Sequence, residues 1–362
     1  MKEFDQYLEI VIIAIIIAGL GFLFITVLLF AYRRFMEWGF SQLEYKRYFT
    51  KEGAFEGETV YFVEEMTNGF FLAFKDIAVE SHISSGIKLS GCKGDDKIQH
   101  FVSIFSLKPR TRIVRRHKAV CMKRGHYVLE SARIGYGDKD VFINSKHEFN
   151  VYPKETPIEQ QESLNMYLQY SNYSKYPIVE DAFSVNGIRE YGYGDAMSKI
   201  NHKATAKAGK MMVNVNDYVL GRRVMVYLNF QVPDDTYIPM EMFEVHMENA
   251  LSYVSYLIGE CARCGFDFGF ACNSRMAYGG RSAKYPISSG NGAYIDILNI
   301  LACARPIEGD SILPSMDKDI SENLTNAEIF FFTLKVDEAI DRRLVQLENM
   351  GNVVTVIRID EV

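Results

Sequence analysis

Four cysteines in the C-terminal half of the chain are the residues best suited to hold a metal or carry redox chemistry. Cys261 and Cys264 form a C-x-x-C pair, and Cys272 and Cys303 follow without a second such pair. Four thiolates could bind zinc, and a C-x-x-C pair at the start of a helix could be redox-active. We expect this pair at the end of a helix, where the helix dipole raises the pKa of a thiol. We therefore predict buried, reduced thiols, no bound metal and no cofactor.

A second group of chemically distinctive residues lies between positions 187 and 207. Gly192 and Gly194 allow a tight turn in which Asp195 can accept backbone hydrogen bonds. Arg189 could bind a carboxylate, Asp195 being one choice, through two parallel hydrogen bonds. Two interpretations stay open: a structural clasp before the first strand of a sheet, or a contact surface for a ligand or partner.

Residues 108–124 carry eight basic side chains. On a domain held near a bilayer, such a stretch could contact anionic headgroups at about 1 kcal/mol per nearby charge. A solvated strand surface is the plainer interpretation. The net charge of −6 and the lack of an RNA-recognition or zinc-finger pattern argue against nucleic acid as a partner. The candidate lipid contacts are Arg112, Arg115, Arg116 and Lys118.

The remaining motifs give no support for hydrolase chemistry. The sequence contains no G-x-x-x-x-G-K-[ST], no G-x-S-x-G and no H-E-x-x-H. A glycine-rich loop at residues 288–292 precedes a predicted helix, and a helix N-terminus after glycines can bind phosphate. We expect this loop at the ligand or partner crevice of an α/β domain, and we expect the protein not to be an enzyme.

Residues 10–32 contain no charged side chain and are long enough to cross a hydrocarbon core of about 30 Å as one helix. The acidic leader does not fit a cleaved signal peptide. One Lys precedes the run, whereas four basic residues follow it closely: Arg33, Arg34, Lys46 and Arg47. Positive flanks stay in the cytoplasm. We predict a single-pass cell-membrane protein with residues 1–9 outside and residues 33–362 in the cytoplasm.

The soluble part shows two patterns, in keeping with a length of 362 residues. After a juxtamembrane segment at residues 33–50, residues 51–148 form short strands separated by turn residues, which is typical of a β-sandwich. Residues 149–185 are a connecting segment with one short helix around residues 158–167. Residues 186–362 alternate strands with helices, which predicts a parallel sheet covered by helices on both faces. The expected strands there are 224–230, 266–272, 328–334 and 353–359, and the expected helices are 239–263, 293–304 and 337–350.

The stretch at residues 187–207 resembles the signature of the family called domain of unknown function 58, approximately G-x-R-x-Y-x-x-G-D-x-x-x-x-I-x-W-K-x-x-A-[RK]. His202 stands where that family usually has Trp. Residues 124–127 and 138–142 look like the R-G-x-Y and D-x-F stretches of the same family. The signature residues, which are the candidate partner contacts, are Gly187, Arg189, Tyr191, Gly194, Asp195, Ile200, His202, Lys203, Ala206 and Lys207.

The resemblance implies a membrane segment, a β-sandwich and a von Willebrand factor A-like α/β domain of Rossmann type. In many members the first strand of that domain leads into D-x-S-x-S, whose three oxygens face one divalent cation. Here Asn229 replaces the carboxylate and Gln231 replaces a hydroxyl residue. We predict a degenerate, metal-free site.

Family members look to be associated with MoxR-type AAA+ ATPases, which implies a role in assembly or maturation of a complex near the membrane. The sequence thus predicts a membrane-anchored, cytosol-facing interaction or scaffold protein with an AAA+ ATPase partner. One alternative is a module that binds anionic lipid or cell envelope through residues 108–124. A thiol- or metal-dependent enzyme is the less favoured alternative.

Overall fold

A computed structural model describes residues 2–90, 98–137, 139–157, 179–192, 195–219, 223–232, 238–307 and 309–361. The chain divides into two compact units, Met1–Val151 and Tyr152–Val362. The predicted short helix at residues 158–167 lies outside the described residues.

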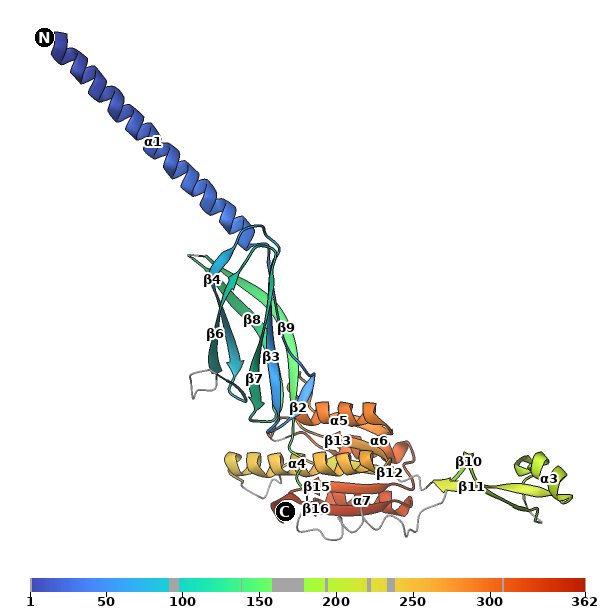
Figure 1. The fold of residues 1–362 in the computed structure, drawn as a ribbon. Helices are drawn as coiled ribbons and strands as arrows, with labels where there is room; N and C mark the ends of the chain where they lie inside the picture. The colour runs from blue at the N-terminus through green and yellow to red at the C-terminus, as the bar shows by residue number, and fades with distance from the viewer. Residues whose placement is uncertain are drawn as a thin grey trace. The chain divides into compact units, whose positions relative to one another are not determined.

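The N-terminal unit begins with one continuous helix, α1 (Lys2–Phe40) (Figure 1). Its segment Ile15–Phe40 is long and apolar enough to cross a membrane. The predicted long apolar helix is therefore confirmed. It extends beyond the predicted range at both ends, because residues 2–9 of the predicted outer segment and the start of the juxtamembrane segment are helical as well.

Two antiparallel sheets follow α1 and form the rest of the N-terminal unit. The predicted juxtamembrane segment is not a separate element, because its second half is the first strand of a sheet. One sheet has the order β1 (Leu43–Phe49), β3 (Thr59–Asn68), β7 (Arg112–Cys121), β5 (Ile87–Leu89). The other has the order β2 (Gly53–Phe55), β9 (Lys139–Tyr152), β8 (Gly125–Tyr136), β4 (Phe74–Ser84), β6 (Ile98–Leu107).

Side chains from both sheets meet in two buried clusters, so the sheets pack face to face as predicted for a sandwich. In one cluster Phe49 of β1 packs against Phe149 of β9, with ring centroids 4.4 Å apart. The other cluster includes Met36 and Phe40 of α1. The last turns of α1 are therefore part of the sandwich core, and the sandwich begins before the predicted boundary at residue 51.

The C-terminal unit contains a two-stranded hairpin and a five-stranded sheet. The hairpin pairs β10 (Val179–Glu190) with β11 (Met212–Val219), and the chain between them forms the short 3₁₀ helix η1 (Met197–Lys199) and α3 (His202–Ala208) (Figure 1). The sheet has the order β14 (Ala283–Ser288), β13 (Asp267–Cys272), β12 (Arg223–Leu228), β15 (Glu328–Thr333), β16 (Val353–Arg358). The helices are α4 (Met240–Arg263), α5 (Asn291–Cys303), α6 (Leu313–Ser321) and α7 (Glu338–Asn349), and the 3₁₀ helix η2 (Ile359–Glu361) follows β16.

Successive side chains of a strand point to opposite faces of the sheet, and these strands are buried on both sides, so the sheet has two apolar faces. Met225 and Tyr227 pack in one cluster with residues of α6 and α7. Helix α4 instead contacts β12 and β13. It does so through a stripe of fully buried residues at the predicted helical spacing: Phe243, Met247, Leu251, Val254 and Ile258. Helices thus cover both faces, as predicted.

The prediction of an all-parallel sheet is wrong at one edge. Strands β13, β12, β15 and β16 are parallel, but β14 runs antiparallel to β13, with Cys272 opposite Ala283 and Phe268 opposite Ser288. Residues 273–282, which connect β13 to β14, contain no helix, so the chain returns beside β13 without a crossover. The end of β14 therefore lies at the amino ends of the parallel strands.

Glu328, the first residue of β15, is a buried carboxyl group, with 4% of its surface exposed. Its Oε2 atom has no hydrogen-bond partner among the described residues. Burial raises the pKa of Glu328 from 4.5 to about 8, because ionisation in an apolar surrounding is costly. The folded state therefore retains a proton that the unfolded state releases, and stability falls as the pH rises from 4.5 through 8.

We expect Glu328→Gln to stabilise the C-terminal unit above pH 8 by about 2–4 kcal/mol, with a gain that vanishes below about pH 4.5. Hydrogen–deuterium exchange of peptides from β12 and β15 at several pH values measures this. A gain that does not depend on pH would contradict the assignment.

Candidate functional site

The predicted pair between Arg189 and Asp195 is present in the structure. Arg189 donates from Nη1 to Oδ2 of Asp195 at 2.7 Å and from Nη2 to Oδ1 at 2.6 Å. The backbone N–H of Gly192 donates to the same Oδ2 at 2.7 Å. The guanidinium of Arg189, together with this N–H, lowers the pKa of Asp195 to about 2. The pair is thus charged at all ordinary pH values. Gly194 lies outside the described residues.

The paired side chains of Arg189 and Asp195 form the clasp. The residues that follow the clasp hold α3 against the neighbouring strand, β11. Asn201 caps the helix by accepting a hydrogen bond from the N–H of Ala204 at 2.9 Å. Its side-chain amide also donates to Oδ1 of Asn214 on β11 at 2.7 Å. Gly209 ends the helix in the left-handed region, at φ 67°. A helix of only seven residues therefore has a defined place on the hairpin.

The structure separates the signature residues into two groups. Arg189 and Asp195 hold the clasp, while Ile200 lies half-buried in an isolated bridge to Val213. Tyr191 and Gly187 are also half-buried. Helix α3 has no buried residue, and its exposed signature residues are His202, Lys203, Ala206 and Lys207. The clasp interpretation thus fits the first group, and a contact surface fits the exposed face of α3.

We expect Arg189→Lys to loosen residues 187–207, because an ammonium group cannot form two parallel hydrogen bonds to one carboxylate. Amide exchange in peptides covering η1 and α3 should rise several-fold, while exchange in β12 and β15 stays unchanged. Unchanged exchange in η1 and α3 would show that the pair does not hold the segment.

The predicted degenerate metal position lies at the carboxyl end of β12, beside β15, where the sheet order changes direction. Ligands of open α/β sheets bind at such a switch point. Here Asn229, which is 1% exposed, donates from Nδ2 to Oγ1 of Thr333 at 3.2 Å. Its Oδ1 accepts from Nδ2 of Asn273 at 2.8 Å and from the N–H of Gln231 at 3.1 Å. Neutral amide and hydroxyl groups therefore link the carboxyl ends of β12, β13 and β15 to one another.

Their hydrogen bonds occupy the oxygens that a cation would need. Oδ1 of Asn273 accepts from the N–H of Phe230 at 2.7 Å, and the Thr333 hydroxyl donates to the carbonyl of Lys335 at 2.7 Å. Within the described ranges, no three His, Cys, Asp or Glu side chains are grouped as metal ligands. The chemistry of this edge is that of a closed structural network.

Sequence reasoning identified Asn229 and Gln231 but missed Asn273 and Thr333. A signal was present, because Asn273 directly follows one predicted strand and Thr333 lies in another. The carboxyl ends of parallel strands share one edge of a sheet, so these residues were candidates for the same place.

We expect Asn229→Asp to destabilise the C-terminal unit by about 1–3 kcal/mol, because it removes the donor to Thr333 and buries a charge. Exchange of β12 and β15 peptides should rise, and added Mg²⁺ should not reverse the effect. Gln231→Glu, at a half-buried position, is the control for added charge. Rescue of Asn229→Asp by Mg²⁺ would contradict a closed network.

The predicted contact loop at residues 288–292 does not lie at this edge. Because β14 is antiparallel, its last residue pairs with Phe268 near the start of β13. The loop is thus at the amino ends of the parallel strands, away from the switch point. Helix α5 begins after Gly290, which has φ 92°.

The cysteines are thiols, but they do not share one environment. Cys261 lies buried in α4, and Cys264 follows the helix as its C-terminal cap, as the sequence predicts. Cys272 and Cys303 are buried, and burial raises the pKa of Cys272 to about 11. Cys264 is exposed, so the prediction of four buried thiols is wrong there.

The basic stretch at residues 108–124 does not form one surface. Alternation along β7 exposes Arg112, Arg116 and Lys118. Arg115 instead faces inward, with its guanidinium carbon 4.2 Å from the ring centroid of Phe105 and a hydrogen bond to Oγ of Ser103 at 3.1 Å. Arg115 is thus half-buried and does not lie on the same face of β7 as the other three candidates.

Comparisons with known proteins give no identity. No protein-family model matches the chain, and no curated protein matches it. Among solved structures, the CARDB domain of PF1109 from Pyrococcus furiosus is similar over 30% of this chain and 92% of that chain, with 12% identity and a TM-score of 0.23. A non-cellulosomal cohesin from Archaeoglobus fulgidus is similar over 34% of this chain and 98% of that chain, with 10% identity and a TM-score of 0.22. Likenesses this weak carry no argument about activity.

Proposed function

We propose that this protein is a membrane-anchored interaction protein whose C-terminal unit is a von Willebrand factor A-like domain. In this proposal α1 crosses the cell membrane once, and the sandwich and the α/β unit face the cytoplasm. The partner is a MoxR-type AAA+ ATPase, as the resemblance to the family called domain of unknown function 58 implies. The protein would serve the assembly or maturation of a complex near the membrane.

The observation that carries the proposal is the exposed face of α3. The clasp and the Asn201 cap hold this short helix in place, and none of its residues is buried. Folding alone does not require Lys203 and Lys207 to be presented in this way, because neither contributes to a core. A fixed, exposed, basic helix suits contact with an acidic protein surface.

The switch-point edge does not support a metal-dependent role, whether in adhesion or in hydrolysis. Metal-dependent adhesion or hydrolysis needs charged or open oxygens at that edge. The network of Asn229, Asn273 and Thr333 uses these atoms for internal hydrogen bonds. The four basic residues that follow the apolar run support the cytoplasmic orientation.

Gentle detergent extraction of the tagged full-length protein, followed by mass spectrometry with and without ATP, tests the proposal. We expect an AAA+ ATPase whose recovery depends on nucleotide. Replacing both Lys203 and Lys207 with Glu should lower its recovery at least about tenfold. The matched control replaces Lys318 and Arg342, exposed on α6 and α7, with Glu and should leave recovery unchanged.

Two results would contradict the proposal. One is extraction without any nucleotide-sensitive protein. The other is an equal loss of partner in the α3 variant and its control, which would indicate general charge attraction rather than a docking helix.

A further inference from the structure

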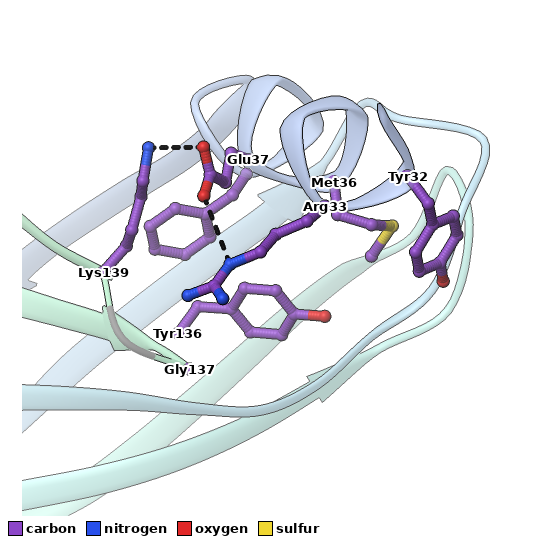
Figure 2. A pocket seen from close by; sticks show the side chains of 8 residues that line it. Tyr32, Arg33, Met36, Glu37, Tyr136, Gly137 and Lys139 are labelled. Carbon is purple, nitrogen blue, oxygen red and sulfur yellow. Dashed lines mark ion pairs between the residues drawn. The ribbon is translucent and has the colours of Figure 1, made fainter. Parts of the chain in front are cut away.

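A cavity of about 280 Å³ lies where α1 meets the sandwich, entirely within the N-terminal unit. One wall is a face of α1 that includes Tyr32, Arg33 and Met36 (Figure 2). The other wall comes from Tyr136 and Lys139, at the adjoining ends of β8 and β9. Parts of the chain about 100 residues apart thus build one site.

Charged groups from both walls meet at this cavity. Nζ of Lys139 lies 2.7 Å from Oε2 of Glu37, and Nε of Arg33 lies 3.7 Å from Oε1 of the same residue (Figure 2). Arg34 reaches the same carboxylate at 3.2 Å. Of the eight described residues that line the cavity, two are cationic and one is anionic. The lining therefore favours an anionic group.

On the side of α1, apolar side chains line the cavity and extend beyond it along the helix. Met36 and Phe40 line it, and Phe40 stacks on Tyr136 with ring centroids 5.4 Å apart. Toward the N-terminus, the helix exposes an unbroken apolar surface, including Leu28 and Leu29. A ligand with a charged head and a long apolar tail matches both surfaces.

Exposed aromatic residues lie near the C-terminal end of α1. The rings of Phe35 and Trp38 on α1 pack against the ring of Phe70, with centroid distances of 5.3 and 5.4 Å. The ring centroid of Phe71 lies 4.5 Å from that of Phe70. Trp38 and Phe71 remain 56% and 54% exposed. Exposed aromatic rings next to the first charges after an apolar span are typical of a membrane–water interface.

We propose that this cavity binds the headgroup of an anionic phospholipid. Arg33 and Lys139 hold the phosphate, the two tyrosines border it, and the acyl chains lie along the exposed face of α1. This inference depends on α1 lying in a bilayer but not on the AAA+ partner or on α3. The sandwich would then be tied to the bilayer by a lipid as well as by the helix.

A pair of fluorescence reporters tests the inference, because Trp38 is the chain's only tryptophan. Tyr32 lines the cavity, whereas Trp38 does not. The full-length protein and a Trp38→Phe, Tyr32→Trp variant are reconstituted in phosphatidylcholine vesicles with a minor share of phosphatidylglycerol. Bromine is placed on the acyl chains of one lipid or the other. We expect the share of quenching at position 32 that comes from brominated phosphatidylglycerol to be about fivefold the mole fraction of that lipid. At position 38 we expect this share to be close to the mole fraction.

Lys139→Gln, added to the position-32 reporter, should bring quenching down to the mole fraction, and Lys139→Arg should retain the enrichment. Arg34→Gln is the matched control, since it removes one charge next to the cavity without changing its lining. Unchanged amide exchange in β8 and β9 would confirm that the variants fold.

Four results would overturn the inference. Equal enrichment at both reporters, or equal loss in Lys139→Gln and Arg34→Gln, would indicate attraction to the charged helix end as a whole. No quenching at either reporter would show that α1 does not lie in the bilayer. Loss of the enrichment on adding soluble glycerol phosphate would assign the cavity to a free anion. None of these results bears on the ATPase partner.

Discussion

The burial of the last turns of α1 in the sandwich is the constraint on which the N-terminal unit depends. The same helix exposes apolar side chains as far as Tyr32 and then contributes Met36 and Phe40 to a buried cluster. Gly39 makes the close approach possible, because a Cβ atom there would lie 2.5 Å from the ring of Phe70. A helix that ended at residue 32 would leave the Phe70 side of the sandwich uncovered. The last turns of α1 and the sandwich thus share one core.

The two candidate sites of the C-terminal unit use polar groups in opposite ways. At the sheet edge, Asn229 and Asn273 satisfy one another in a buried network, which leaves little capacity for a ligand. At the hairpin, Arg189 and Asp195 pair at the surface and so order a segment whose short helix, α3, has no buried side chain. The first arrangement stabilises a fold, and the second presents a surface.

The sequence predicted best the elements whose burial leaves a periodic pattern. The stripe from Phe243 to Ile258 identified α4 within a residue at its start, and the buried runs identified β12, β13, β15 and β16. Strands β1 and β14 were missed, because Leu43–Phe49 and Ala283–Ser288 mix polar and apolar residues and owe their conformation to pairing partners. The pair of Arg189 and Asp195 was predictable because it is local. The contact between Tyr136 and Phe40 was not, because tertiary folding alone brings them together.

The basic stretch shows how strand geometry divides a charge run that looks uniform in sequence. Successive side chains of a strand point to opposite faces, so only alternate charges of β7 can serve one surface.

The inward charges then need partners within the sandwich. Glu64, fully buried on β3, lies opposite Arg115 of β7 in the sheet and accepts a hydrogen bond from the Tyr45 hydroxyl at 2.7 Å. His117 contacts the other oxygen of Glu64 at 3.0 Å. Part of the positive charge that suggested a lipid surface thus belongs to the interior of the sandwich, beside a buried carboxylate. The charges of Arg33 and Lys139, which are far apart in sequence, instead converge near the C-terminal end of α1. The register of the strands therefore decides which cations share one surface.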